Sequence, residues 1–299
     1  MRSTREGYGQ ALLELGKNKN VVALSADLTG STKANYFAEK YPSRFFQCGV
    51  AEQNMIAMAA GLALEGKIPF ASSFGVFVPM RCLDQIRMSV CYNNSNVKIV
   101  ATHCGLATGE DGATHQALED VAALRSLPRI TIIEPCDYKQ AMEATKAAAK
   151  IKGPVYLRLH RGKFNDLKTF GFKIGKAKVL KKGNKITIIT SGPIINEVLK
   201  ASVEVDGIEI INCHTIKPLD SKTILKSVRK TKKVIVVQDH QKIGGLGSAV
   251  CELLSEKYPV KVKVIGVDDK FAESGSPSEL WEKYGLSSES IIKEIKKFI

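Results

Sequence analysis

The sequence predicts an α/β protein with two domains, each a mainly parallel sheet flanked by helices. Short apolar runs rich in Val and Ile alternate with helical patterns, and this alternation occurs twice along the chain. Continuous apolar strands separated by helices are typical of parallel sheets covered on both faces. With 299 residues, the chain is long enough for two cores of ordinary size.

The first domain is predicted over residues 1–165. Its expected strands are the apolar runs at residues 21–27, 45–50, 68–74, 97–102, 130–135 and 155–160. Helical patterns lie between several of them, including KQAMEATKAAAK at residues 139–150.

A polar, Gly- and Lys-rich stretch follows Arg161, and we interpret residues 166–180 as a linker. The second domain is predicted over residues 181–299. Its expected strands lie at residues 186–190, 208–213, 234–239 and 262–267, and a helix is expected near residues 287–298.

Composition excludes several classes of protein. Hydrophobic residues make up 44% of the chain and charged residues 25%, as in a folded globular protein. No apolar run approaches the ~20 residues of a membrane span, and the start MRSTREGYGQ lacks a secretory core, so we expect a cytoplasmic protein without a membrane partner. The seven cysteines form no CxxC pair, which argues against a zinc site or a disulfide framework.

The net charge of +14 comes mostly from scattered lysines without interleaved aromatic residues. This pattern does not predict nucleic-acid binding. A positive field of this kind would instead steer small anions such as sugar phosphates toward the protein.

A glutamate at the head of an apolar helix raises the first functional question. Glu52 precedes the segment from Met55 to Leu64, which is almost wholly apolar or small and predicts a helix buried on all sides. A buried carboxylate is costly unless something accepts its charge or its proton. Glu52 either complements the free N–H groups of its own first turn or serves a ligand.

Polar side chains also follow the other predicted strands of the first domain. Because ligands of parallel α/β sheets gather at the carboxyl ends of strands, these residues are candidates for one site. They comprise Asp27, Ser31, Glu52, Phe74, Phe77, His103, Asp111, His115, His160 and Arg161.

A set of motifs in a fixed order resembles the second half of a transketolase. The matching segments include SADLTGS at 25–31, GVAEQNMIAMAAGLAL at 49–64, SSFGVF at 72–77, THCGLATGEDGATHQALED at 102–120 and GPVYLRLHR at 153–161. The resemblance implies a pyrimidine-binding domain followed by a transketolase C-terminal domain, and a thiamine-diphosphate enzyme. One departure is Ala113, where many members have proline, which bears on the rigidity of that loop.

The resemblance assigns cofactor-binding roles to Asp27, Glu52, Phe74, Phe77 and His115. Glu52 matches the glutamate that bonds N1′ of the cofactor's aminopyrimidine, which promotes removal of the C2 proton of the thiazolium ring. Phe74 and Phe77 match aromatic residues packed around the aminopyrimidine, and His115 matches a position beside its amino group. Glu52, His103 and His115 are therefore the expected catalytic residues.

The resemblance also assigns substrate-binding roles. Arg5, Ser31, His103 and Arg161 match positions that hold the terminal phosphate of the sugar, and Asp111 matches an acid that recognises a donor hydroxyl. Arginines, a hydroxyl and an imidazole suit phosphate oxygens. The implied reaction transfers a two-carbon ketol unit from a ketose phosphate, such as xylulose 5-phosphate, to an aldose phosphate, such as ribose 5-phosphate.

Three alternatives stay open at the level of sequence. The chain resembles, less well, the β-subunit of a 2-oxoacid dehydrogenase, which lacks the GEDGATHQ pattern in this form. Half of a deoxyxylulose-phosphate synthase is another possibility, but those enzymes have DR followed by Gly where this chain has His103, Cys104 and Gly105. A non-catalytic interaction protein that kept the fold is the third.

A partner subunit is expected because the metal-binding half of the cofactor site has no match. The family holds the cofactor's pyrophosphate through Mg2+ bound by a GDG motif and a later asparagine, and the nearest string here is GEDG at 109–112. We therefore expect an N-terminal transketolase subunit to supply the pyrophosphate-binding domain and Mg2+ in an α2β2 assembly. Met1 lies only a few residues before Arg5, as expected if a separate gene encodes that domain.

Overall fold

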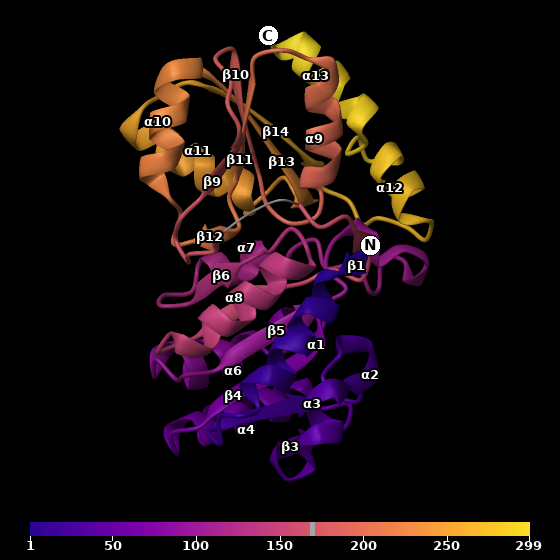
Figure 1. Cartoon of the computed structure of the whole chain (residues 1–299), viewed down its shortest axis with the longest axis vertical. Helices are drawn as coiled ribbons and strands as arrows, with labels where there is room; N and C mark the ends of the chain where they lie inside the picture. The colour runs from indigo at the N-terminus through magenta and orange to yellow at the C-terminus, as the bar shows by residue number, and fades with distance from the viewer. Residues whose placement is uncertain (168–170) are drawn as a thin grey trace.

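The chain forms two α/β domains, one above the other, in a computed structural model that describes residues 1–167 and 171–299 (Figure 1). The first half contains these elements: β1 (Arg2–Ser3), α1 (Thr4–Leu15), β2 (Val21–Ser25), α2 (Thr29–Thr32), α3 (Asn35–Lys40), η1 (Pro42–Arg44), β3 (Phe45–Gln47), α4 (Glu52–Leu64), β4 (Ile68–Phe74), α5 (Val78–Arg81), α6 (Leu83–Gln85), η2 (Ile86–Tyr92), β5 (Lys98–Thr102), η3 (Leu106–Asp111), α7 (Asp120–Arg125), β6 (Thr131–Ile133), α8 (Tyr138–Lys150), β7 (Val155–Arg158) and β8 (Lys163–Phe164).

The second half contains β9 (Lys178–Lys181), β10 (Ile186–Thr190), α9 (Ile195–Glu204), β11 (Ile208–Asn212), β12 (Thr215–Lys217), α10 (Ser221–Thr231), β13 (Lys233–Gln241), α11 (Leu246–Lys257), β14 (Lys261–Val267), α12 (Pro277–Lys283) and α13 (Ser288–Phe298). Its sheet has the order β14-β13-β10-β11-β9, and only β9 runs antiparallel to its neighbour. Helices α10 and α11 cover one face of this sheet, and α9 and α13 cover the other (Figure 1).

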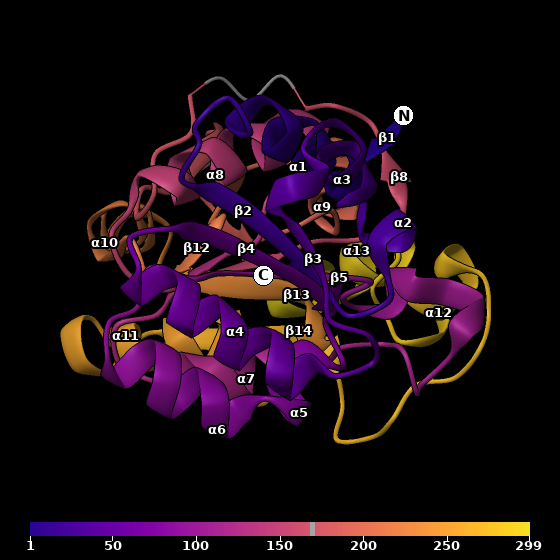
Figure 2. The ribbon, with the colours of Figure 1, turned by 90° about the horizontal axis from the view of Figure 1, so that it is seen from below.

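The sheet of the first domain has seven strands in the order β12-β6-β7-β5-β4-β2-β3. All neighbouring pairs are parallel except β12 with β6. Helices α1, α3 and α8 lie on one face, and α4, α6 and α7 lie on the other (Figure 2). The predicted α/β class with two mainly parallel, helix-flanked sheets is confirmed, because each apolar run became a strand within a few residues of its expected limits.

The prediction that α4 is buried on all sides is wrong. One face packs through Met55, Ile56 and Ala59 against the sheet, whereas Met58 is 37% and Leu64 69% exposed. These two belong to a larger apolar surface on this side of the domain, which we call the α4–η2 face; it comprises Val50, Met58, Leu64, Met80, Leu83, Met88 and Tyr92. Several exposed apolar side chains on neighbouring elements are typical of an interaction site.

The second half of the chain also completes the first sheet. Strand β12 comes from the segment after β11, yet it pairs with β6. A single apolar cluster runs from Ile99 and Ile132 of the first sheet to Ile211 of the second and Ile224 of α10. The two halves therefore share a core, and the predicted linker at 166–180 includes residues 168–170, which lie outside the described residues, and the start of β9. The predicted domain limits stay a prediction.

A buried arginine joins the two sheets where their carboxyl ends meet. Arg158, 1% exposed, donates to both oxygens of Asp120 at 2.8 and 3.2 Å, and it also donates to Glu134 and to the backbone oxygen of Asp239. Glu134 in turn accepts from Ser191, directly after β10, at 2.5 Å. Burial alone would raise the pKa of Glu134, but Arg158 and His160 hold that pKa well below its usual range.

None of the helices within residues 1–167 and 171–299 combines the length and the apolar character that a bilayer crossing requires.

We expect Arg158→Met to lower the free energy of unfolding by about 3–5 kcal/mol, because it leaves two buried carboxylates without their cation. Urea unfolding of the isolated chain measures this change. Arg87→Met is the matched control: Arg87 is exposed, and its replacement should change stability by less than about 0.5 kcal/mol. Equal unfolding midpoints for the two variants would contradict the role given to Arg158.

Candidate active site

Strand order explains why residues far apart in sequence come together. Strands β7, β5, β4 and β2 are neighbours in the parallel sheet, so their carboxyl ends lie side by side. Arg161 follows β7, His103 follows β5, Phe74 ends β4, and Ser31 lies in α2 after β2. This edge is where open α/β sheets place their ligands.

A cavity of about 420 Å³ opens at this edge. It is lined by Arg5, Gly30, Ser31, Lys33, Phe74, His103, Asp111 and Arg161. The structure thus brings together all the residues that the sequence predicted for substrate binding. It adds Lys33, which sequence reasoning missed because the residue lies at the left-handed end of a four-residue helix, where no periodic pattern marks it.

Arg5 is held at the cavity by the start of α1. A capping box between Ser3 and Glu6 fixes this first turn. The Arg5 guanidinium donates through Nη1 to the Ser31 backbone oxygen at 2.9 Å and to His103 Nε2 at 3.3 Å. Its buried Nε has no hydrogen-bond partner, and burial followed by the charge of Arg161 lowers its pKa. Within the described residues Arg5 forms no ion pair, so an anion in the cavity would meet an unmatched cation.

His103 enters the cavity as a neutral imidazole. Burial and the charges of Arg5 and Arg161 lower the pKa of His103 to about 3. Because a guanidinium only donates, Nε2 accepts from Arg5, and the ring proton lies on Nδ1, which donates to Thr102 Oγ1 at 2.9 Å. The backbone of His103 is left-handed, with φ of 58°, a strained conformation that is often found at functional sites.

Arg161 and Asp111 pair across the mouth of the cavity. Arg161 Nη1 donates to Asp111 Oδ2 at 3.1 Å and to the Thr108 backbone oxygen at 3.0 Å. Each of the two side chains is 38% exposed. An ion pair so open to solvent is worth only ~0–1 kcal/mol, so a ligand can separate it at little cost.

Aromatic rings connect the cavity to a second group of residues. The Phe74 ring stacks on His103 at 3.8 Å between centroids and on Phe77 at 5.8 Å. His115 meets the edge of Phe77 at 5.4 Å. Phe74 therefore belongs both to the cavity and to the group in which the sequence predicts the cofactor's aminopyrimidine.

Glu52 lies at the far end of this group and is 4% exposed. Its two carboxylate oxygens accept from Nη1 of Arg81 at 3.1 and 3.2 Å. No side chain caps α4, and within the described residues Glu52 accepts no N–H of its own first turn, so the helix-capping explanation is not supported. Arg81 also lies over the Phe77 ring, 4.0 Å from its centroid.

Arg81 is a functional candidate that sequence reasoning missed. It is 29 residues from Glu52 and 48% exposed, and nothing in its local sequence distinguishes it from a surface arginine. The buried Glu52 was the available indication, because an isolated buried carboxylate requires a cation or a proton donor.

Asp27 is placed differently from the other predicted residues. It follows β2 with φ of 57°, its side chain is exposed, and its backbone N–H donates to Gln47 Oε1 at 2.8 Å. It does not line the cavity, and its role at the cofactor stays a prediction. Across residues 1–167 and 171–299 there is no cluster of three His, Cys, Asp or Glu side chains that could hold a metal ion.

Comparison with known proteins gives a consistent picture. The family model "Transketolase, pyrimidine binding domain" matches residues 1–166, and "Transketolase, C-terminal domain" matches residues 175–291. A protein of Methanocaldococcus jannaschii named for a transketolase C-terminal section is 46% identical, over 98% of this chain and 95% of that protein.

Two further relatives carry more specific names. A 6-deoxy-6-sulfo-D-fructose transketolase subunit of Clostridium sp. is 40% identical over 97% of this chain and 92% of its own length. One subunit of an apulose-4-phosphate transketolase of Phocaeicola vulgatus is 36% identical over 100% of this chain and 98% of its own length. A solved structure described as a split gene transketolase, inactive beta4 tetramer, superposes with a TM-score of 0.92 at 43% identity and covers 100% of this chain and 98% of that one.

The ion pair between Glu52 and Arg81 should be detectable in the isolated chain. Arg81→Met leaves Glu52 buried without its cation and should cost about 1–2 kcal/mol of unfolding free energy, at the low end because Arg81 is half exposed. The same change in a Glu52→Gln background should cost much less. A double-mutant cycle from urea unfolding measures the coupling. Additive effects of the two substitutions would contradict a direct interaction.

Proposed function

Because the chain belongs to the transketolase family, we propose that it is the C-terminal subunit of a split transketolase, a transferase that depends on thiamine diphosphate. The proposed reaction moves a two-carbon ketol unit from a ketose phosphate to an aldose phosphate. The observation that carries this proposal is the convergence of Arg5, His103 and Arg161 on one cavity, next to an aromatic group that leads to buried Glu52.

The residues around Phe77 fit the pyrimidine half of the cofactor. Thiamine diphosphate, when bound, supplies a nucleophilic carbon that accepts the ketol unit. Glu52 offers a carboxylate in a nearly dry position, where it can hold a proton at the N1′ nitrogen of an aminopyrimidine. Phe74 and Phe77 offer aromatic faces for the heterocycle, and His115, which meets their edges, would move a proton at the amino group.

The cavity fits a phosphorylated sugar. Its cations Arg5, Lys33 and Arg161 outnumber its single acid, Asp111. Arg5, with no carboxylate partner among the described residues, is the strongest candidate for the phosphate. Separation of the Arg161–Asp111 pair would free the guanidinium for phosphate and the carboxylate for a sugar hydroxyl.

The choice of sugar belongs to the proposal as well. We propose xylulose 5-phosphate as donor and ribose 5-phosphate as acceptor, on the family's general chemistry. Relatives named for a sulfonated fructose and for apulose 4-phosphate indicate that subunits of this kind differ in the sugars they accept. The β-subunit of a 2-oxoacid dehydrogenase and half of a deoxyxylulose-phosphate synthase are not favoured, since both family models are those of transketolase and His103 lines the cavity.

The partner would be an N-terminal subunit that carries the pyrophosphate-binding domain and holds Mg2+, in an α2β2 assembly. The α4–η2 face supports this proposal, because α4 begins at Glu52 and a subunit that completes the cofactor site would cover the same helix. The similar solved structure, composed of β subunits alone, is described as inactive.

The chain by itself should bind thiamine diphosphate weakly and transfer no ketol unit. Addition of an N-terminal transketolase subunit with Mg2+ should produce both binding and activity, because the pyrophosphate needs hard oxygen ligands from that subunit. Calorimetric titration and a coupled assay with xylulose 5-phosphate and ribose 5-phosphate measure the two properties. Tight binding and ketol transfer by the isolated chain would overturn the split-enzyme proposal.

Arg5→Ala and Arg161→Ala should act selectively on phosphorylated sugars. In the assembled enzyme, each change should cost about 2–4 kcal/mol of transition-state binding for a sugar phosphate, because remote phosphate contacts position the reacting carbonyl. This loss would appear as a lower kcat/KM for that sugar. The non-phosphorylated donor hydroxypyruvate should lose much less, and Arg229→Ala, at an exposed residue of α10, should change neither. Equal losses for both kinds of donor would show that the arginines are not phosphate ligands.

A further inference from the structure

We propose that the C-terminal half of the chain positions the substrate-binding loops through two residues, Asp239 and Ser274, although neither lines the substrate cavity. This inference rests on the proposed function only for the meaning of the cavity; the contacts themselves are independent of it. Asp239 holds the turn that carries His103, and Ser274 holds the loop that carries Asp111.

Asp239 is a buried carboxylate with a donor on each oxygen. Its Oδ1 accepts the Leu106 backbone N–H at 2.8 Å, and its Oδ2 accepts Nε1–H of Trp281 at 3.2 Å. It is 2% exposed. Only a carboxylate at this position accepts from both sides, because the amide of an asparagine offers one acceptor and turns a donor toward the other N–H.

The turn from His103 to Leu106 has left-handed residues and packs closely against Asp239. His103 has φ of 58° and Gly105 φ of 74°, and a side chain at Gly105 would lie 2.4 Å from Asp239 Oδ2. Residues in such conformations persist when their surroundings fix them. The Thr108 hydroxyl completes the turn by donating to the His103 backbone oxygen at 2.7 Å. Asp239 therefore restricts the backbone that orients His103 in the cavity.

The loop with Asp111 is held by the segment before α12. The Ser274 hydroxyl donates to the Glu110 backbone oxygen at 2.5 Å, directly before Asp111. Gln116 Nε2 donates to the Glu273 backbone oxygen at 3.0 Å. Gly112, with φ of 74°, packs against Ser274, so that a Cβ at Gly112 would lie 3.5 Å from the serine side chain. Two hydrogen bonds thus fix the two ends of this loop to the C-terminal half.

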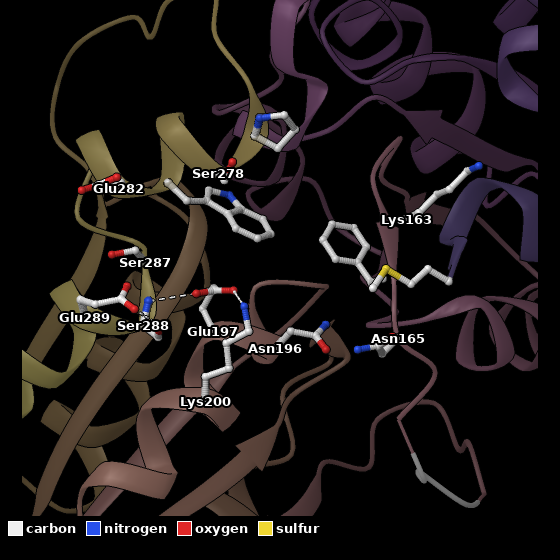
Figure 3. A pocket seen from close by; sticks show the side chains of 14 residues that line it. Lys163, Asn165, Asn196, Glu197, Lys200, Ser278, Glu282, Ser287, Ser288 and Glu289 are labelled. Carbon is white, nitrogen blue, oxygen red and sulfur yellow. Dashed lines mark hydrogen bonds and ion pairs between the residues drawn. The ribbon is translucent and has the colours of Figure 1, made fainter.

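Trp281 is a fluorescent probe of the contacts of Asp239. It is the single tryptophan of the chain, and its indole N–H bonds Asp239. It also stacks on Phe164 at 5.8 Å between centroids and borders a cavity of about 540 Å³ at the junction of the two halves. In that cavity Glu197 accepts from the Ser288 amide and pairs with Lys200 (Figure 3). A change at Asp239 should therefore alter the fluorescence of Trp281.

Hydrogen–deuterium exchange of the isolated chain tests the contacts without any assumption about the reaction. Asp239→Asn should speed exchange at the Leu106 amide and shift the fluorescence of Trp281. Ser274→Ala should speed exchange across residues 109–116. Asp268→Asn and Ser278→Ala are matched controls on exposed side chains of the same half and should leave both segments unchanged.

Kinetic measurements on the assembled enzyme test whether the two loop contacts affect sugar binding. Ser274→Ala should raise KM for the donor sugar phosphate on the order of fivefold, and Asp239→Asn by at least as much, which corresponds to the loss of one hydrogen bond. The affinity for thiamine diphosphate should change much less than KM, because Glu52 and Phe77 touch neither loop contact and His115 is the one member of the cofactor group within residues 109–116. Ser274→Thr keeps the hydroxyl and should restore KM.

The outcomes separate the two hypotheses. If the wild-type mixture shows no ketol transfer, the proposed function fails, while the exchange data still decide the positioning role. If exchange at residues 103–116 and KM for the sugar are unchanged in Ser274→Ala and Asp239→Asn, the inference is overturned. A parallel loss of cofactor affinity and sugar affinity would also overturn it, because that result indicates general destabilisation. Ser274→Ala, on an exposed loop, keeps the test decisive should Asp239→Asn fail to fold.

Discussion

The buried guanidinium of Arg158 is the interaction on which the arrangement of the two sheets depends. A charge without water is tolerated only with its counterions and hydrogen bonds in place, so Asp120, Glu134 and the Asp239 carbonyl must all surround it. Glu134 and Asp239 lie at the carboxyl ends of strands β6 and β13 in the two sheets, and Asp120 begins α7. The second sheet consequently lies over the β6 part of the first sheet's carboxyl edge. The cavity lined by Arg161, His103, Phe74 and Ser31 opens beside it, at the ends of β7, β5, β4 and β2.

Much of the fold follows from local sequence, whereas the features that shape the site do not. Apolar runs such as residues 68–74 and 186–190 predict buried strands because continuous Val, Ile and Phe side chains suit a sheet covered on both faces. Strand β12 was not predicted, since its three residues carry no period and their partner, β6, lies some 80 residues earlier. The exposed side of α4 was missed for another reason: apolar composition does not distinguish burial within a chain from burial against a partner.

Some site residues could be predicted from the sequence, and others could not. Ser31, His103, Asp111 and Arg161 were identified through motifs in a fixed order, and Arg5 through the same family resemblance; strand order in the sheet explains why they line one cavity. Arg81 and Lys33 were missed because their positions follow from tertiary contacts. The charge states in the cavity could not be predicted from the sequence. His103 is neutral because burial and two arginines lower its pKa. Arg161 and Asp111, which the sequence predicted as separate ligands, form an ion pair.

The contacts inside this chain differ in kind from those expected between subunits. Its two halves share an apolar cluster, a donated strand and a buried ion network, and separation of such elements would expose apolar surface and unpaired charge together. The α4–η2 face presents apolar side chains such as Val50 and Tyr92, 73% and 74% exposed, whereas the core behind it contains the buried Met55, Ile56 and Ala59. The proposed division of the enzyme at this face would leave the buried ion network of Arg158 intact, whereas a division between the two sheets would break it.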